Sequence, residues 1–135
     1  MTSHPVNPRA LGQLEERIMA IIWGRATGMS VRDVGRALDA SHASAYTTVM
    51  TTLDRLYKKG LLERRKEGMA FVYKAALTRD EYHRRLVEVT VTGLVARSSS
   101  ADPVLSAFID AAASVDEANL RRIEELVAER RRKGQ

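Results

Sequence analysis

One face of the helix predicted over residues 44–59 combines hydroxyl side chains with positive charge. Its members are Thr47, Thr48, Thr51, Arg55 and Lys58. Threonine is a poor helix former, so a helix that only faced solvent would favour Glu, Lys or Ala at these positions. Hydroxyl groups can bind base edges or phosphates, and cations can bind phosphates. The face is therefore typical of a helix that lies in a groove of DNA.

The opposite face of this helix is apolar and would hold it against a protein core. Its members recur at helical spacing, and they are Ala45, Val49, Thr52, Leu53 and Leu56. Ser44 can cap the N-terminus of the helix and lie with the DNA-facing residues, and Gly60 stands where a left-handed C-terminal cap belongs. Two interpretations of Tyr46 stay open, because it could belong to the core or bind a phosphate through its hydroxyl.

Other elements must position this helix. Apolar residues at helical spacing predict a helix over 10–26, and Ser30 can cap a second helix that runs to Leu38. After Gly60 the period changes, and residues 61–66 and 69–74 predict two strands of a β-hairpin. Three consecutive cations lie beside its tip, and they are Arg64, Arg65 and Lys66. Three helices followed by a basic hairpin are the parts of a winged helix-turn-helix.

The positive charge of the chain is concentrated in this predicted module. The chain has 135 residues with 22 Lys+Arg against 17 Asp+Glu, a net charge of +5. Residues 41–76 hold seven cations and three acids, whereas residues 83–135 hold nine cations and eight acids. The excess therefore lies on the third helix and the hairpin, as expected of a DNA-binding module. We assign Lys58 and Lys59 to phosphates rather than to bases.

Several classes of protein are excluded by what the sequence lacks. The chain has no cysteine, which excludes thiol enzymes, disulfide scaffolds and cysteine-based metal sites. Its three histidines, His4, His42 and His83, have no mutual ligand spacing, and no catalytic motif is present. We therefore expect no enzymatic activity, metal or cofactor. No apolar run could span a bilayer, and the polar first nine residues are not a signal peptide, so we expect a cytoplasmic protein.

The C-terminal region from residue 78 onward is predicted to be helical and to form a dimer. Thr78 with Glu81 and Ser114 with Glu117 read as capping boxes, and a serine-rich linker separates the helices. The apolar residues that would face a second copy are Leu86, Val89, Leu94, Leu105, Phe108, Ile109, Leu120, Ile123, Leu126 and Val127. We expect a flexible tail over 1–9, a winged helix over 10–77 and a helical dimerisation region over 78–135. A symmetric dimer would present two helices about 34 Å apart to palindromic DNA.

Three segments resemble the penicillinase-repressor family of the BlaI/MecI type. They are SAYTTVMTTLDRLYKKGLLERRKEGMAFVYKA, LGQLEERIMAIIW and SVRDVGRAL, and the C-terminal helices match more loosely. The resemblance implies a cytoplasmic homodimeric repressor, mainly α-helical with a small β-hairpin, that binds a palindromic operator. It also implies that Tyr46, Thr47, Thr48, Thr51 and Arg55 occupy recognition-helix positions and that residues 64–66 occupy the wing.

Two departures from that family concern the inducing signal. Antibiotic-responsive members are cleaved at an Asn-Phe bond in the dimerisation region, where this chain has Ala107-Phe108. Copper-responsive relatives carry a C-terminal cysteine cluster, which this chain lacks. The signal, a sensor protease or a small-molecule inducer, therefore stays open.

The alternative function is a winged helix that docks on another protein through its C-terminal helices and does not bind DNA in a sequence-specific way. The basic hairpin favours DNA. Arg55 also has an alternative role, because it could pair with an acid of its own chain instead of a phosphate.

Overall fold

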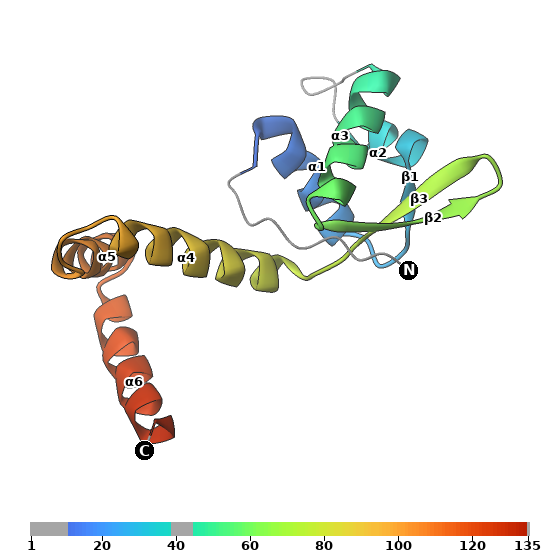
Figure 1. Cartoon of the computed structure of the whole chain (residues 1–135). Helices are drawn as coiled ribbons and strands as arrows, with labels where there is room; N and C mark the ends of the chain where they lie inside the picture. Colours follow the sequence, from blue (N-terminus) through green and yellow to red (C-terminus); the bar gives the residue numbers. More distant parts are fainter. Residues whose placement is uncertain (1–10, 39–44, 135) are drawn as a thin grey trace. The chain divides into compact units, whose positions relative to one another are not determined.

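The computed structural model describes residues 11–38 and 45–134. In that part of the chain the elements follow one another as shown in Figure 1. They are α1 (Gln13–Trp23), β1 (Met29–Ser30), α2 (Val31–Ala37), α3 (Tyr46–Lys58), β2 (Leu62–Glu67), β3 (Ala70–Ala75), α4 (Arg79–Ala96), α5 (Asp102–Val115) and α6 (Ala118–Lys133). The predicted fold class, mainly α-helical with a small β-hairpin, is confirmed. None of the described helices is both long and apolar enough to cross a membrane.

The sheet has one more strand than the sequence predicted. Its order is β1-β3-β2 with antiparallel pairing throughout, and β1 pairs Met29 with Tyr73. The predicted hairpin is formed by β2 and β3, with Glu67 opposite Ala70, so the turn lies one residue later than predicted. Gly68 occupies this turn with a φ of 64°. β1 has only two residues, too few to show a strand period, and it exists because β3 offers it a partner.

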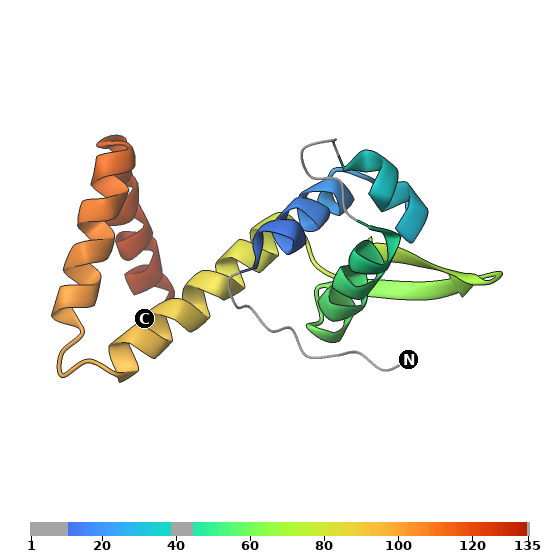
Figure 2. The same ribbon diagram turned by 90° about the horizontal axis from the view of Figure 1, so that it is seen from above.

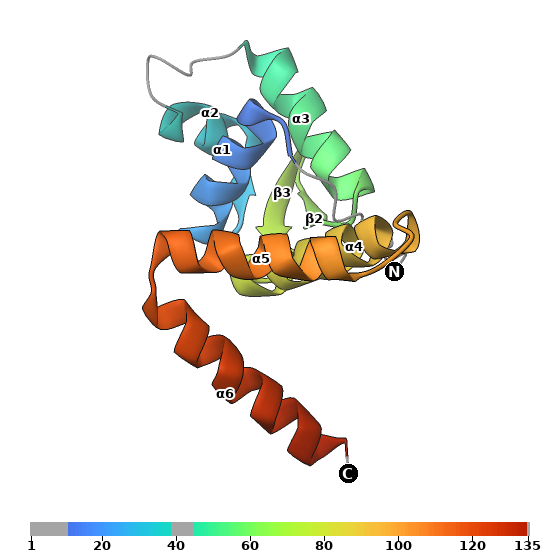
Figure 3. The ribbon, with the colours of Figure 1, turned by 90° about the vertical axis from the view of Figure 1, so that its left-hand side faces the viewer.

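Helices α1, α2 and α3 gather around the sheet (Figures 1 and 3). Among the described residues, one cluster of buried apolar side chains holds these elements together. Helix α1 contributes Ile18 and Ile22, and α3 contributes the fully buried Leu53. The predicted inner face of α3 is confirmed at Val49, Thr52, Leu53 and Leu56, while Ala45 at its end is exposed. Gly60, with a φ of 83°, follows α3 in the predicted left-handed conformation.

Helix α2 begins at the predicted cap. The Ser30 hydroxyl accepts a hydrogen bond from the Asp33 amide at 3.1 Å, and the Asp33 carboxylate accepts one from the Ser30 amide at 3.0 Å. These two bonds satisfy donors that the first turn of a helix leaves unpaired. The hydrogen bonds from Ser30, the backbone one first, lower the pKa of Asp33 below its ordinary value.

The first half of α4 belongs to the same compact unit as the winged helix. By internal contacts the chain divides into residues 1–88 and residues 89–135. Tyr82 is buried in the winged-helix core, and Leu86 packs against that core. Leu86 was predicted to face a second copy, but these contacts within its own chain account for its apolar character. The Trp23 indole N–H also donates to the Leu77 carbonyl at 3.0 Å, just before α4.

The second unit contains the end of α4 together with α5 and α6, which lie side by side (Figure 2). The Asn119 side-chain amide donates to the Ala112 carbonyl at 2.9 Å and so ties α6 to α5. The predicted capping box at Ser114 is wrong, because Ser114 lies inside α5 and donates back to Ala111 at 2.9 Å. Asp116 instead accepts from the Ala118 amide at 2.9 Å, at the start of α6.

Candidate nucleic-acid interface

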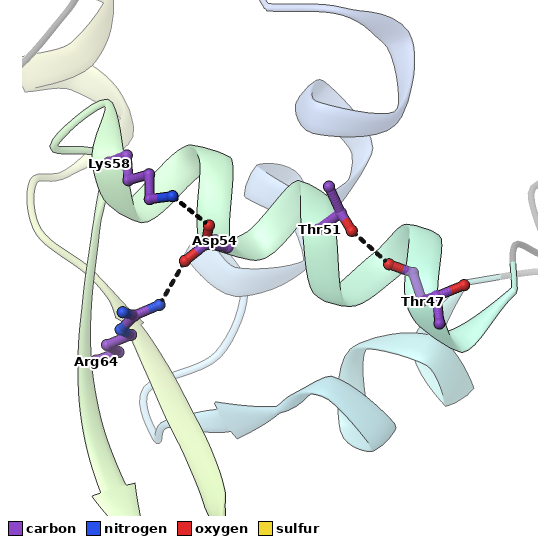
Figure 4. Close-up of polar contacts among 5 residues, drawn as sticks. All are labelled: Thr47, Thr51, Asp54, Lys58 and Arg64. Carbon is purple, nitrogen blue, oxygen red and sulfur yellow. Dashed lines mark hydrogen bonds and ion pairs between the residues drawn. The ribbon is translucent and has the colours of Figure 1, made fainter.

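The outer face of α3 presents the predicted polar residues. The threonines Thr47, Thr48 and Thr51 are exposed, together with Arg55 and Lys58. Figure 4 shows Thr47, Thr51, Asp54 and Lys58 along one side of the helix. The face exists because the four apolar-side residues of α3 anchor the helix from behind. Ser44 lies outside the residues that the structure describes.

Two hydroxyls on α3 are oriented by the helix itself. Thr51 Oγ1 donates to the Thr47 carbonyl at 2.8 Å (Figure 4), and Thr52 Oγ1 donates to the Thr48 carbonyl at 2.7 Å. Since its proton is used inside the helix, the exposed Thr51 hydroxyl offers lone pairs outward as an acceptor. In the major groove, the hydroxyl oxygen of Thr51 could accept from the amino group of a base, and its methyl group could contact a thymine methyl. Thr52 is 5% exposed and serves the core.

Two larger side chains extend the exposed surface near the start of α3. Tyr46 is 58% exposed, which excludes the core interpretation that the sequence left open. Met50, one turn later, is 43% exposed, and the sequence predicted no DNA contact for it. The signal in the sequence is that Met50 follows Tyr46 by four residues, the spacing of one helical turn, and does not belong to the apolar series of Val49 and Leu53.

The cations of α3 have different surroundings. Arg55 is exposed, and within the described residues it makes no ion pair. Lys58 pairs with Asp54 at 3.0 Å but remains 67% exposed. Lys59, assigned from the sequence to a phosphate, instead pairs with Glu15 of α1 at 2.6 Å and is 25% exposed. That contact joins the end of α3 to α1, so Lys59 is turned toward the protein.

The three cations of the wing, the β2–β3 hairpin, do not share one face. Arg64 is opposite Tyr73 and Lys66 is opposite Phe71, whereas Arg65 is opposite Val72. Directly paired residues of antiparallel strands lie on the same face, so Arg65 lies on the other side of the hairpin from its two neighbours. Arg65 is 59% exposed and contacts Glu67 at 3.2 Å, and Lys66 is also exposed.

Arg64 is the least exposed of these three cations and lies between the wing and α3. Its Nη1 atom is 2.7 Å from Asp54 Oδ1, and its side chain is 22% exposed (Figure 4). The guanidinium carbon lies 4.0 Å from the centre of the Tyr57 ring and 4.3 Å from that of Phe71. Asp54 entered the charge count of residues 41–76 only as one of three acids, although its spacing to Lys58 is that of a helical ion pair.

This cluster shifts the titration of both charged partners. Hydrogen bonds from Lys58 and then from Arg64 hold the pKa of the Asp54 carboxyl below its ordinary value, against the opposing effect of burial. Burial lowers the pKa of Arg64, but the hydrogen bond to Asp54 and the nearby Tyr73 phenol raise it by more. Both groups are therefore charged at neutral pH and attract each other.

The comparisons with known proteins agree with this geometry. The family model described as penicillinase repressor matches residues 11–129. The transcriptional regulator BlaI of Mycobacterium tuberculosis is 36% identical over 112 residues, which are 83% of this chain and 80% of that protein. The penicillinase repressor of Bacillus licheniformis is 31% identical over 72 residues, which are 53% of this chain and 56% of that protein.

A solved structure supports the fold of the first unit. The DNA-binding domain of the repressor BlaI, solved in solution, matches with a TM-score of 0.50 and 28% identity. The match covers 58% of this chain and 94% of that domain. The family consists of repressors rather than enzymes, which confirms the prediction that the chain has no enzymatic activity. The chain belongs to the penicillinase repressor family of winged-helix transcriptional repressors.

Proposed function

We propose that the protein is a cytoplasmic homodimer that represses transcription by binding a palindromic DNA operator. The observation that supports this most strongly is the exposed face of α3, where three threonines and Arg55 project beside a basic hairpin. A helix of this kind fits the major groove of B-DNA, and the hairpin would then meet the adjacent backbone.

The side chains divide into base contacts and phosphate contacts. Thr47, Thr48 and Thr51 read base edges, because they are short and lie on the N-terminal half of α3. The phosphate contacts are assigned to Tyr46, Arg55, Lys58, Arg65 and Lys66, which are all exposed. Met50 adds an apolar contact to sugars or thymine methyl groups. Phosphate contacts set the affinity and the register, and the threonines set the sequence preference.

The second unit is assigned to dimerisation because it does not bury its own apolar side chains. No residue of α5 or α6 is buried, and both helices lie wholly within the described part of the chain. The exposed or half-buried apolar residues are Val89, Leu94, Leu105, Phe108, Ile109, Leu120, Ile123, Leu126 and Val127. A second copy that covers these side chains would remove them from water and pair two DNA-binding units.

An inducing signal would act on this dimerisation unit. Release requires only that the two DNA-binding units become uncoupled, because each half-site alone holds the protein more weakly. A sensor protease or a small-molecule inducer could both achieve this. Ala107 and Phe108, at the position of the family's cleavage site, lie inside α5. A protease would therefore have to open that helix before cutting the bond between them.

Binding of the full-length protein to DNA tests the proposed function. DNA selected from a random pool by the protein should be palindromic and should resist competition by unrelated DNA in a gel shift. If a dimer neutralises about six to eight phosphates, the logarithm of the binding constant falls with the logarithm of salt with a slope of about −5 to −7. A slope near −1, or no preferred sequence, would instead favour a winged helix that docks on another protein.

A further inference from the structure

We propose that Arg64 is a positioning residue that fixes the wing against the recognition helix α3, and that it does not contact a DNA phosphate. This inference rests on the proposed function, since it assigns how the DNA-binding surface is held in shape. It differs from the sequence-based assignment, which placed Arg64, Arg65 and Lys66 together in the DNA-binding wing.

The guanidinium of Arg64 is already occupied by contacts within the protein. One edge of it donates to Asp54 at 2.7 Å, and its carbon lies close to the centres of two rings, Tyr57 at 4.0 Å and Phe71 at 4.3 Å. A planar guanidinium gains from an ion pair along its edge and from aromatic contacts on its surface. Moving Arg64 to a phosphate would break all three contacts.

Asp54 binds both Arg64 and Lys58. Its Oδ1 atom faces Arg64 of β2 at 2.7 Å, and its Oδ2 atom faces Lys58 of α3 at 3.0 Å. A phosphate approaching Arg64 would come close to this carboxylate, whose charge repels it. The two cations Arg64 and Lys58 share the one carboxylate of Asp54, so the local charge here is +1.

The contacts of Arg64 join three different elements of the fold. Tyr57 and Asp54 belong to α3, Phe71 belongs to β3 and Arg64 belongs to β2, so the cluster links the recognition helix to both strands of the wing. A wing held in place before DNA arrives avoids the entropy loss of ordering it on binding. Arg64 therefore contributes to operator affinity through the placement of Arg65 and Lys66.

The salt dependence of binding separates a positioning role from a phosphate contact. Arg64→Met keeps an apolar stem between the rings, Arg64→Lys keeps the charge without the planar edge, and Arg65→Met is the matched control. Operator and unrelated DNA are titrated by fluorescence anisotropy at several salt concentrations, and thermal unfolding checks that each variant is folded.

We expect Arg64→Met to weaken operator binding about tenfold or more, since it loses the charged hydrogen bond to Asp54, without a change in salt slope. Arg64→Lys can still donate to Asp54 but loses the planar guanidinium between the two rings, so it should recover only part of the affinity, again at an unchanged slope. Arg65→Met should weaken both kinds of DNA and make the slope shallower by about two for a dimer. A shallower slope, or an unchanged operator affinity, for Arg64→Met would overturn the positioning role.

A double-mutant cycle tests whether Arg64 acts through Asp54. Asp54→Asn should weaken operator binding, and adding Arg64→Met to it should have little further effect, because the two residues form one unit. Additive losses would contradict the inference. If the wild-type protein prefers no DNA sequence, the proposed function itself fails, which is a different result from any of these.

Discussion

Gly28 lies so close to Val72 that a Cβ atom on Gly28 would be 2.3 Å from Val72 Cγ1. Gly28 does not have the left-handed backbone of Gly60 and Gly68, so space rather than conformation requires glycine there. The contact brings the chain beside β3 just before β1 begins at Met29. The short strand β1 therefore depends on a glycine, which has no side chain, at position 28.

Gly28→Ala should destabilise the winged helix by about 1–3 kcal/mol, because the added methyl group overpacks the site. Urea denaturation followed by circular dichroism measures the change. In a Val72→Ala background, Gly28→Ala should cost less stability than it does in the wild-type protein, since the clashing methyl group of Val72 is gone. Equal destabilisation in both backgrounds would show that the Gly28–Val72 contact is not the cause.

Thr51→Val should weaken binding to the selected operator by about 1–3 kcal/mol and change binding to unrelated DNA little. The valine keeps the shape of the side chain but removes the oxygen that accepts from a base. Competition gel shifts with operator variants measure the change in preference. Thr52→Val is the matched control, because Thr52 is 5% exposed and should leave the sequence preference unchanged. An equal effect of both variants would indicate a role in stability instead.

Ser30→Ala should reduce the free energy of unfolding by about 0.5–2 kcal/mol, because it removes the N-terminal cap of α2. Ser30→Asp restores a capping acceptor and should recover much of the lost stability. Chemical denaturation of the two variants measures the difference in their free energies of unfolding. If alanine is tolerated as well as aspartate, the cap seen between Ser30 and Asp33 contributes nothing to stability.

Phe108→Glu should shift the protein toward a monomer, since the charged side chain would be placed at the predicted interface. Sedimentation velocity measures the oligomeric state, and operator affinity should fall toward that of one half-site. Phe108→Leu keeps an apolar side chain of similar size and should remain dimeric. Phe108 is 52% exposed in the single chain, so neither change should unfold it. A Phe108→Glu protein that is still dimeric would move the interface elsewhere.

The contact between Asp54 and Arg64 should be insensitive to pH near neutrality and be lost in acid. The folded protein lowers the pKa of Asp54 below its ordinary value of 3.8. A lowered carboxyl pKa stabilises the folded state above that value, and the contribution disappears as the pH falls through the lower folded pKa. An NMR titration of the Asp54 carboxyl should show this, and Arg64→Met should move the midpoint upward. An unchanged midpoint would contradict the pairing.

Local patterns were sufficient for much of the molecule. The apolar spacing of Val49, Leu53 and Leu56 predicted which side of α3 is buried, and Thr51 and Arg55 were therefore predicted to face outward. The change of period after Gly60 predicted the two strands of the hairpin. These features could be predicted because the periods of helices and strands determine which residues share a face.

Contacts between residues distant in sequence were decided only by the tertiary structure. Residue spacing shows that a face is buried but not against what, so Leu86 was assigned to a second copy although it packs on its own core. Likewise, consecutive cations in the wing suggested one surface, whereas pairing with β3 turns Arg65 to one side and Arg64 toward Asp54. The sequence by itself determined the elements and their polar faces. Only the fold decided which charges are free to meet DNA, because ion pairs across elements depend on how those elements pack.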